Sequence, residues 1–248
     1  MKIDFEKIEN LKKELDKYRP FNEDLAKMLR EDLKVRFTYN SNAIEGNTLT
    51  IYETKVILED GITVGGKSLR EHLEVINHAD AIGYIEELVL SHEKLSKRDL
   101  MDIHRLVLKG IDNKYAGTYR DIPVIISGVD HIPPSHIMIP QLMEDLLNWY
   151  SDESKDLHPI ERASILHGRL SKIHPFKDGN GRTSRLILNF ELMKNGYLPV
   201  VIEAKDKPKY IEALAKGDES EDYLELTELV YQLELRELER YTNLFSQV

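Results

Sequence analysis

The sequence predicts an all-α protein, a bundle of helices interrupted by one short hairpin. Apolar residues recur at three- and four-residue steps along most of the chain, which is the spacing of one helix face. Thr50 with Glu53 and Ser68 with Glu71 have the spacing of capping boxes, so each pair is expected to begin a helix. Residues 123–134 differ, because a β-branched run, a turn and a short apolar return predict a small β-hairpin or extended flap there.

The remaining helices are expected in chain order from the same periodicity. The first carries Phe5, Ile8, Leu11, Leu15 and Tyr18 and stops at Pro20; the second carries Leu25, Leu29, Leu33 and Phe37 and ends at the polar run 39–42. Others are expected at 96–109, 140–150, 159–173, 182–194 and 223–245. Since no repeat or low-complexity linker is found, we expect one globular unit, made of an N-terminal helical region (1–94), a core (95–230) and a C-terminal helix (231–248).

Composition narrows the class of function. The chain has 248 residues, a formal charge of −10 and no cysteine. Disulfides and thiolate metal sites are therefore excluded, and the acidic balance argues against general nucleic-acid binding. No apolar stretch is long enough to span a bilayer and the N-terminus does not resemble a signal peptide, so we expect a cytoplasmic protein that does not bind membranes. His136, His158 and His167 have no zinc-site spacing and are expected in solvated or capping roles.

Residues 174–185 combine the groups that phosphoryl-type transfer requires. The predicted helix 159–173 ends at His174-Pro175, and Gly179-Asn180-Gly181 then leads into the next helix near Arg182. A glycine-rich turn at a helix N-terminus predicts a phosphate-binding site, and Arg185 shares a helix face with Arg182. Asp178 is a hard oxygen ligand suited to Mg²⁺. A lone His-Pro is more often a helix cap and a lone Gly-Asn-Gly a turn, but together these residues predict a base, a metal ligand and an anion site.

The run from His174 to Arg185 resembles the complete signature of the Fic family, HPFx(D/E)GNGRxxR, and residues 117–134 resemble the flap of that family. The resemblance implies a Fic-fold helical bundle that transfers AMP from ATP to a Tyr, Thr or Ser hydroxyl of a target protein. His174 would be the base, and Asp178 would hold Mg²⁺, or Mn²⁺ in its place. The phosphates would be bound by Asp178, Gly179, Asn180, Gly181, Arg182, Thr183, Ser184 and Arg185.

The resemblance also implies contacts outside the loop. The flap would align the target by strand addition and would include Val124, Ile125, Ile126, Ser127, Gly128 and His131. Adenine would be contacted near Tyr210 and Ile211, although relatives often have a second tyrosine at the position of Ile211.

Ser41, Glu45 and Gly46 resemble the inhibitory motif (S/T)xxxE(G/N) of the same family. The same residues also fit an ordinary helix end with Gly46 as its C-cap. The resemblance implies that Glu45 pairs with Arg185 and inhibits transfer of AMP. Removal of AMP, transfer of phosphate or phosphocholine, and a catalytically silenced nucleotide-binding regulator are the alternatives. Self-modification and assembly into a homo-oligomer are left open.

Overall fold

The computed structural model describes residues 3–91, 94–125 and 132–246. Within those ranges the chain forms three short 3-10 turns and ten α-helices: α1 (Glu6–Asp16), α2 (Glu23–Ile44), α3 (Ile51–Asp60), α4 (Leu69–Leu90), α5 (Lys97–Leu108), α6 (Ile139–Asp152), α7 (Pro159–Ile173), α8 (Asn180–Lys194), α9 (Lys207–Ser220) and α10 (Leu224–Phe245). The prediction of an all-α protein is confirmed. None of the described helices combines the length and the apolarity that crossing a membrane requires.

The capping boxes of Thr50 and Ser68 are both present, and Ser96 forms a third one at the start of α5. In each, the hydroxyl of the N-cap residue accepts a backbone N–H of the first turn, and the acidic side chain three residues later accepts the backbone N–H of the N-cap residue. Both bonds satisfy donors that the helix leaves unpaired. Helix α9 was not predicted. Its buried residues Tyr210, Ala213, Leu214 and Gly217 nevertheless have the spacing of one helix face.

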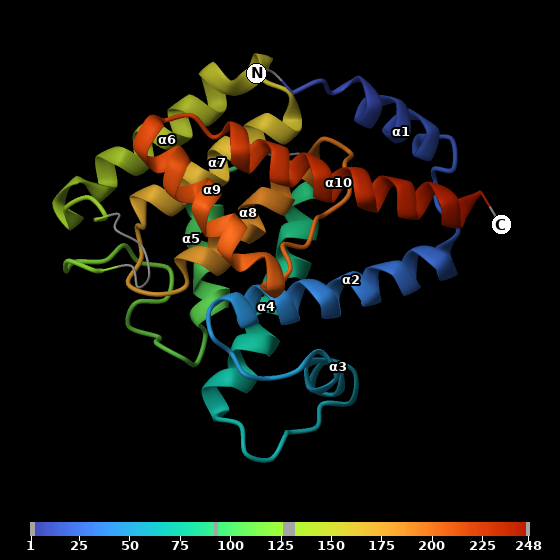
Figure 1. Cartoon of the computed structure of the whole chain (residues 1–248). Coiled ribbons are helices and arrows are strands. Elements are labelled where there is room, and N and C mark those ends of the chain that lie inside the picture. The colour runs from blue at the N-terminus through green and yellow to red at the C-terminus, as the bar shows by residue number, and fades with distance from the viewer. Residues whose placement is uncertain (1–2, 92–93, 126–131, 247–248) are drawn as a thin grey trace.

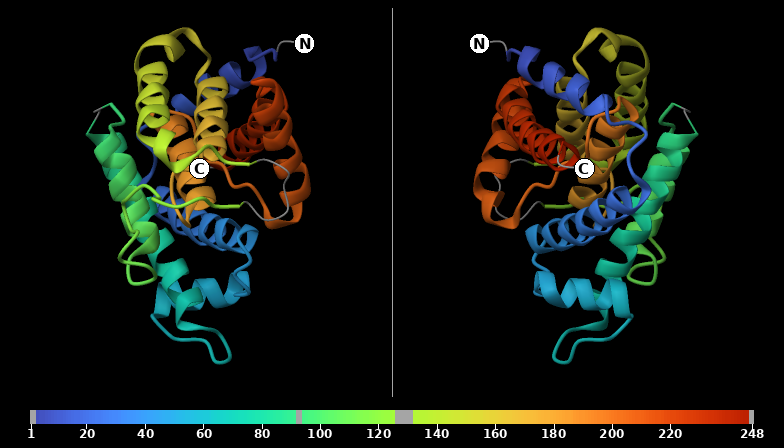
Figure 2. Two further views of the ribbon diagram at one scale, coloured as in Figure 1. Left: turned by 90° about the vertical axis from the view of Figure 1, so that its left-hand side faces the viewer. Right: turned by 90° about the vertical axis from the view of Figure 1, so that its right-hand side faces the viewer.

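Helices α7 and α8 pack against each other at the centre of the molecule (Figure 1). Helix α10 lies across α7 and beside α1, while α2 and α4 pack on α8 from the other side. Figure 2 shows α3 at the end of the molecule away from α1 and α6. The N-terminal helices therefore reach α8 directly and can contribute to a site at its N-terminus.

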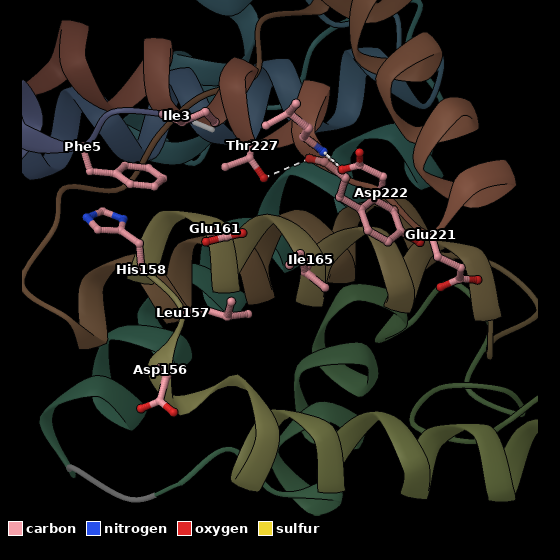
Figure 3. Close-up of a pocket in the computed structure, with 12 residues that line it drawn as sticks. Ile3, Phe5, Asp156, Leu157, His158, Glu161, Ile165, Glu221, Asp222 and Thr227 are labelled. Carbon is pink, nitrogen blue, oxygen red and sulfur yellow. Dashed lines mark hydrogen bonds between the residues drawn. The ribbon is translucent and has the colours of Figure 1, made fainter. Parts of the chain in front are cut away.

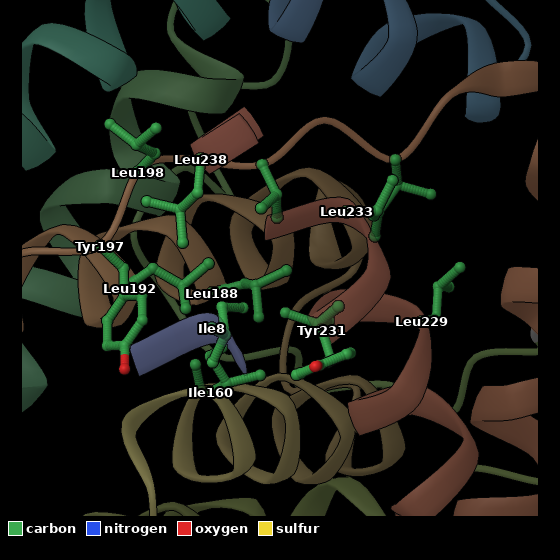
Figure 4. Packing of buried hydrophobic residues seen from close by; sticks show 14 of the residues in the cluster. Ile8, Ile160, Leu188, Leu192, Tyr197, Leu198, Leu229, Tyr231, Leu233 and Leu238 are labelled. Atoms are coloured by element: carbon green, nitrogen blue, oxygen red, sulfur yellow. The ribbon is translucent and has the colours of Figure 1, made fainter. Parts of the chain in front are cut away.

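Two hydrophobic clusters enclose the central pair. One joins α1, α7, α8 and α10 through residues such as Ile8, Ile160, Leu192 and Leu238 (Figure 4). The other joins α5, α6, α7 and α8, and it includes Phe176 from the loop between α7 and α8. Because both helices contribute to both clusters, the loop that connects them is held between two rigid supports.

The polar run at 39–42 lies within α2 rather than at its end, which is a correction. The helix continues to Ile44, and Asn40, Ser41 and Asn42 are buried. The Asn42 amide nitrogen donates to the carbonyl oxygens of Thr38 and Glu74, which satisfies its donors within the buried end of the helix. This end of α2 is a packing surface that faces α4.

The predicted β-hairpin is not found in the described part of residues 123–134, where the backbone is irregular. Val124 and Ile125 lie outside regular secondary structure, as do residues 132–134, and no strand is found in the described ranges. Ile126, Ser127, Gly128 and His131 lie outside the described residues.

Candidate active site

The loop after α7 begins with a reversal of the backbone at His174. This residue has a left-handed conformation (φ 49°, ψ 58°) that ends α7 before Pro175. Its Nδ1 lies 3.3 Å from the carbonyl oxygen of Ser171. When Nδ1 carries the proton and donates to that carbonyl, Nε2 is the basic nitrogen of the neutral ring, as a general base requires.

His104 and Phe176 fix the centre of the loop. The buried Phe176 ring stacks on His104 with centroids 3.6 Å apart and planes 7° apart. The Gly117 N–H donates to His104 Nδ1 at 2.9 Å, so Nε2 carries the proton and donates to the Asp178 carbonyl at 2.9 Å. Burial lowers the pKa of His104 to about 4, which keeps the ring neutral and this tautomer in place.

Arg120 joins the same loop to both ends of the flap segment. Its backbone N–H donates to the Pro175 carbonyl, and its Nε donates to the His174 carbonyl, both at 2.9 Å. The two remaining nitrogens donate to the carbonyls of Ile122 at 3.1 Å and Pro134 at 2.6 Å. A single buried guanidinium thus sets the position of His174 relative to the flap.

The N-terminus of α8 has the backbone geometry of an anion-binding site. Its N-cap, Gly179, has φ 77° and no side-chain capping bond, so N–H groups of the first turn have no partner within the helix. A Cβ at Gly179 would lie 3.1 Å from Val107 Cγ1, which favours glycine here. The Arg182 side chain is 2% exposed, and among the described residues its Nε and Nη1 donate no hydrogen bond. A buried cation with unused donors is suited to bind phosphate oxygens.

Asp178 faces this helix end and is already bound on both oxygens. Its Oδ1 accepts the Gly179 N–H at 2.6 Å and lies 3.5 Å from Arg182 Nη2, and its Oδ2 accepts from Arg70 Nη2. Burial alone would raise the pKa of Asp178, but Arg182, the Gly179 N–H and Arg70 hold it below its usual value. The carboxylate is therefore ionised and able to bind a cation.

The donor set fits Mg²⁺ that is shared with a phosphate substrate. Among the described residues no group of three or more His, Asp or Glu side chains is placed to hold a metal. Asp178 is half-exposed beside the open end of α8, and Mg²⁺ commonly takes one or two carboxylates with phosphates and water as its other ligands.

Glu45 and Arg185 form an ion pair between residues 140 positions apart, with Glu45 Oε1 2.7 Å from Arg185 Nη2. The Arg185 side chain is 3% exposed and that of Glu45 38%. Burial opposes ionisation of Glu45, yet Arg185 holds its pKa below the usual value. A Cβ at Gly181 would lie 2.3 Å from Glu45 Oε1, so the carboxylate occupies the space directly over the α8 N-terminus.

Ser41 and Gly46 belong to the same predicted motif as Glu45. Arg185 Nε donates to the Ser41 hydroxyl at 3.0 Å and its Nη2 to the Ser41 carbonyl at 2.8 Å. Gly46 has φ 97° and follows the end of α2, as the interpretation of a C-cap also required. The two interpretations are compatible, since the helix end is what presents Glu45.

Most of the remaining predicted site residues are buried. Thr183 and Ser184 are fully buried in α8, and Tyr210 is buried with its hydroxyl 3.0 Å from His167 Nε2, while Ile211 is half-buried. The expectation of a solvated or capping role is wrong for His167. Burial lowers its pKa to about 4, and its interior position next to Tyr210 could not be read from local spacing. His158, by contrast, caps α7 through Nδ1.

A separate cavity of about 680 Å³ lies between the N-terminal ends of α7 and α10 (Figure 3). Its lining contains none of residues 174–185, and its charged groups include Asp156, Glu161, Glu221 and Asp222. Four carboxylates repel a polyphosphate, so this cavity is not the nucleotide site.

Sequence reasoning missed several residues of the site. Arg70 and Glu74 on α4 and His104 on α5 approach the loop from elements far away in the sequence, and Lys207 on α9 contacts the end of α2 beside Glu45. Arg70 and Glu74 are four residues apart on a helix, which is a common solvated pair, and no local signal separates them from that case.

The helical core and the loop at the N-terminus of α8 define the class of protein. Residues 94–192 match the Fic/DOC family. Protein adenylyltransferase fic-1 of Caenorhabditis elegans is 39% identical over 193 residues, covering 77% of this chain and 37% of that protein. Protein adenylyltransferase Fic of Nematostella vectensis is 42% identical over 186 residues, covering 73% of this chain and 42% of that protein.

Solved structures of the same family share the fold of this chain over nearly its whole length. A Fic domain containing signaling protein from Bacteroides thetaiotaomicron has a TM-score of 0.89 at 29% identity, covering 97% of this chain and 98% of that one. Residues 134–508 of C. elegans Fic-1 give a TM-score of 0.85 at 31% identity, covering 97% of this chain and 72% of that one. This chain therefore belongs to the Fic/DOC family. It spans less than half the length of the curated relatives named above.

Proposed function

We propose that this chain transfers AMP from ATP to a Tyr, Thr or Ser hydroxyl of a protein, with His174 as the general base. The observation that carries the proposal is the position of His174 directly before the uncapped N-terminus of α8, where Asp178 and the buried Arg182 converge. The names of relatives at 39% and 42% identity, both protein adenylyltransferases, support the same reaction.

In the proposed reaction His174 accepts the proton of the target hydroxyl, and the oxygen attacks the α-phosphorus of ATP. The bond from the α-phosphorus to the bridging oxygen breaks, and diphosphate leaves. Mg²⁺ held by Asp178 would neutralise the phosphates when bound. Arg182 and the backbone of Gly179, Asn180 and Gly181 would stabilise the charge that develops, and Arg185 would bind the γ-phosphate.

The target protein and the adenine base would bind at the positions that the resemblance to the family implies. The segment of Val124 to His131 would form the flap that aligns the target, and Arg120 supports this role because it bonds to Ile122 before that segment and to Pro134 after it. Adenine would lie near Tyr210 and Ile211 on α9. Thr183 and Ser184 would contribute through their backbone, since their side chains are buried. Self-modification and assembly into a homo-oligomer remain part of the proposal. The protein would act in the cytoplasm.

Glu45 would inhibit transfer by competing with the γ-phosphate for Arg185. Without that contact, ATP would be held with its α-phosphate turned away from the attacking hydroxyl, and the in-line geometry would fail. The support is the 2.7 Å ion pair and the position of the Glu45 carboxylate over Gly181.

The test is mass spectrometry of the protein and of lysate proteins after incubation with labelled ATP. Glu45→Gly should increase AMP transfer by more than roughly tenfold, since a charge-assisted hydrogen bond is worth about 1.5–3 kcal/mol. His174→Ala in the same background should abolish transfer and retain ATP binding in calorimetry.

Three other results would contradict the proposal. Transfer of phosphate or phosphocholine would show that a different group is transferred, and loss of AMP from modified proteins without any transfer would show a hydrolase. A folded Glu45→Gly protein that transfers nothing would indicate a silenced regulator. Arg185→Ala with Glu45→Gly should be poorly active, because the γ-phosphate contact itself is then missing.

A further inference from the structure

Arg70 links the candidate metal ligand to a second carboxylate. It lies in the first turn of α4, where its Nη2 donates to Asp178 Oδ2 and its Nε donates to Glu74 Oε1 at 3.1 Å. Neither α4 nor this arginine was singled out by the signature of the loop. Arg70 therefore brings a positive charge from the N-terminal region to the oxygen on which a cation would bind.

Arg182 faces the same two carboxylates from the other side. Its Nη2 lies 3.5 Å from Asp178 Oδ1 and its Nη1 lies 3.5 Å from Glu74 Oε1. The four groups form a closed ring of alternating charge. The two arginines differ in burial, since the side chain of Arg182 is 2% exposed and that of Arg70 is 55% exposed. Arg182 is fixed within the fold, whereas Arg70 can turn into solvent.

We propose that Arg70 is a further determinant of metal and nucleotide binding: it occupies Asp178 Oδ2 in the unliganded protein and leaves when a divalent cation arrives with the nucleotide. The inference rests on the proposed function. A cation such as Mg²⁺ needs a carboxylate oxygen at about 2.1 Å and repels a guanidinium on the same oxygen. Removal of Arg70 should therefore lower the metal concentration that nucleotide binding requires.

Oδ2 is the oxygen that can be released. Oδ1 accepts the Gly179 N–H at 2.6 Å, a bond within the loop itself, and it also faces the buried Arg182. The Asp178 side chain is 43% exposed, so a cation can approach from solvent once Arg70 has moved. Exchange at Oδ2 needs no change in the loop or in α8.

The test is equilibrium binding of α,β-methylene ATP, whose α–β bridge cannot be cleaved, to full-length protein over a series of Mn²⁺ concentrations. Calorimetry measures the nucleotide, and electron paramagnetic resonance measures bound Mn²⁺. The Glu45→Gly protein is the parent, and Arg70→Gln, Arg70→Lys and Arg98→Gln are compared with it in that background, so that Glu45 does not occupy Arg185. Arg98 is the matched control, because it is an exposed arginine whose carboxylate partner, Asp102, lies within its own helix.

Arg70→Gln should lower the Mn²⁺ concentration at half-maximal binding roughly threefold to tenfold, as expected for a half-exposed charge-assisted contact. Arg70→Lys keeps the charge and should stay close to the parent, as should Arg98→Gln. Nucleotide affinity without metal should not rise in Arg70→Gln.

An unchanged Mn²⁺ midpoint in Arg70→Gln would overturn the inference. Tighter nucleotide binding without metal would also overturn it, because Arg70 would then act on the anion site. Weaker binding at every Mn²⁺ concentration would make Arg70 a phosphate contact instead. Absence of nucleotide binding in all variants would reject the proposed function, and the inference with it, while normal binding with no shift rejects the inference alone.

Discussion

Single side chains of the loop pair with residues of the N-terminal helices. Arg185 holds Glu45 and Ser41, and Asp178 holds Arg70. Each pair occupies a group that the proposed reaction needs for phosphate or for metal. At this scale residues from α2 and α4 neutralise the charged groups of the loop.

Asp178→Ala should reduce transfer to background at every Mg²⁺ concentration in the Glu45→Gly protein. No other carboxylate of the loop can hold the ion beside the phosphates, and MgATP then lacks its protein ligand. Transfer of labelled AMP over a magnesium titration measures the effect. Asp112→Asn is the control, because Asp112 pairs with Lys177 of the same loop at 3.3 Å and has no proposed role. Recovery of the full rate at ordinary magnesium would place the metal ligand elsewhere.

At the scale of elements, the end of α2 determines where Glu45 points. Its last turn contains no basic residue, and Lys207 at the start of α9 supplies one by donating from Nζ to the Ile44 carbonyl at 2.7 Å. A cation at a helix C-terminus is stabilising, and here it also ties α2 to the element predicted to contact adenine. Inhibition would then depend on α9 as well as on α2.

Lys207→Ala should raise basal AMP transfer roughly two- to fivefold, because a cation at a helix C-terminus contributes about 0.3–1 kcal/mol. The increase should be smaller than that of Glu45→Gly, whose carboxylate is removed entirely. Lys205→Ala is the matched control, since Lys205 is exposed two residues away and pairs with Glu203. Equal rates for Lys207→Ala and the wild type would show that the α2 end is held without this bond.

Helices α7 and α9 approach each other closely around one aromatic ring. A Cβ at Gly168 or at Gly217 would lie 2.2 Å from the Tyr223 ring. Gly168→Ala should lower the free energy of unfolding by roughly 1–3 kcal/mol through overpacking. Gly83→Ala on α4 is the opposite case, because nothing lies within 4 Å of the new Cβ, and it should raise stability by roughly 0.5–1 kcal/mol. Thermal or urea unfolding measures the free energy of unfolding of both variants. Equal changes in the two variants would contradict the packing argument.

At the scale of the whole molecule, buried neutral histidines link stability to pH. Burial lowers the pKa of His104 and of His167 to about 4, and that of His78 well below its usual value. The unfolded chain binds these protons near pH 6.5. Between pH 6.5 and 4 the unfolded state holds more protons, so stability should fall as the pH falls. Buried Glu234, whose pKa is raised, acts in the opposite direction.

His104→Phe should reduce the slope of the free energy of unfolding against pH between pH 6.5 and 4. The reduction corresponds to about one proton, which is about 1.4 kcal/mol per pH unit. Phenylalanine preserves the stack on Phe176 and removes the titrating group. Urea unfolding at several pH values gives the slope directly. An unchanged slope would mean that His104 is protonated in the folded protein as easily as in the unfolded chain.

The sequence by itself determined the helical class, the helix starts at Thr50, Ser68 and Ser96 and the composition of the 174–185 loop. These features are local, because capping, periodicity and a glycine turn act over a few residues. Helix α9 was not predicted, although its local signal is present, since Tyr210, Ala213, Leu214 and Gly217 have the spacing of one helix face. The division into regions 1–94, 95–230 and 231–248 stays a prediction.

Tertiary structure decided which residues meet at the loop. The resemblance suggested Glu45 for Arg185, but the spacing of residues gave no sign of Arg70 at Asp178, His104 under Phe176, Arg120 between the loop and the flap or Lys207 at the end of α2. Contacts between residues far apart in sequence depend on how α4, α5 and α9 pack around α7 and α8. Helix packing brings side chains together by shape and burial, which no single segment encodes.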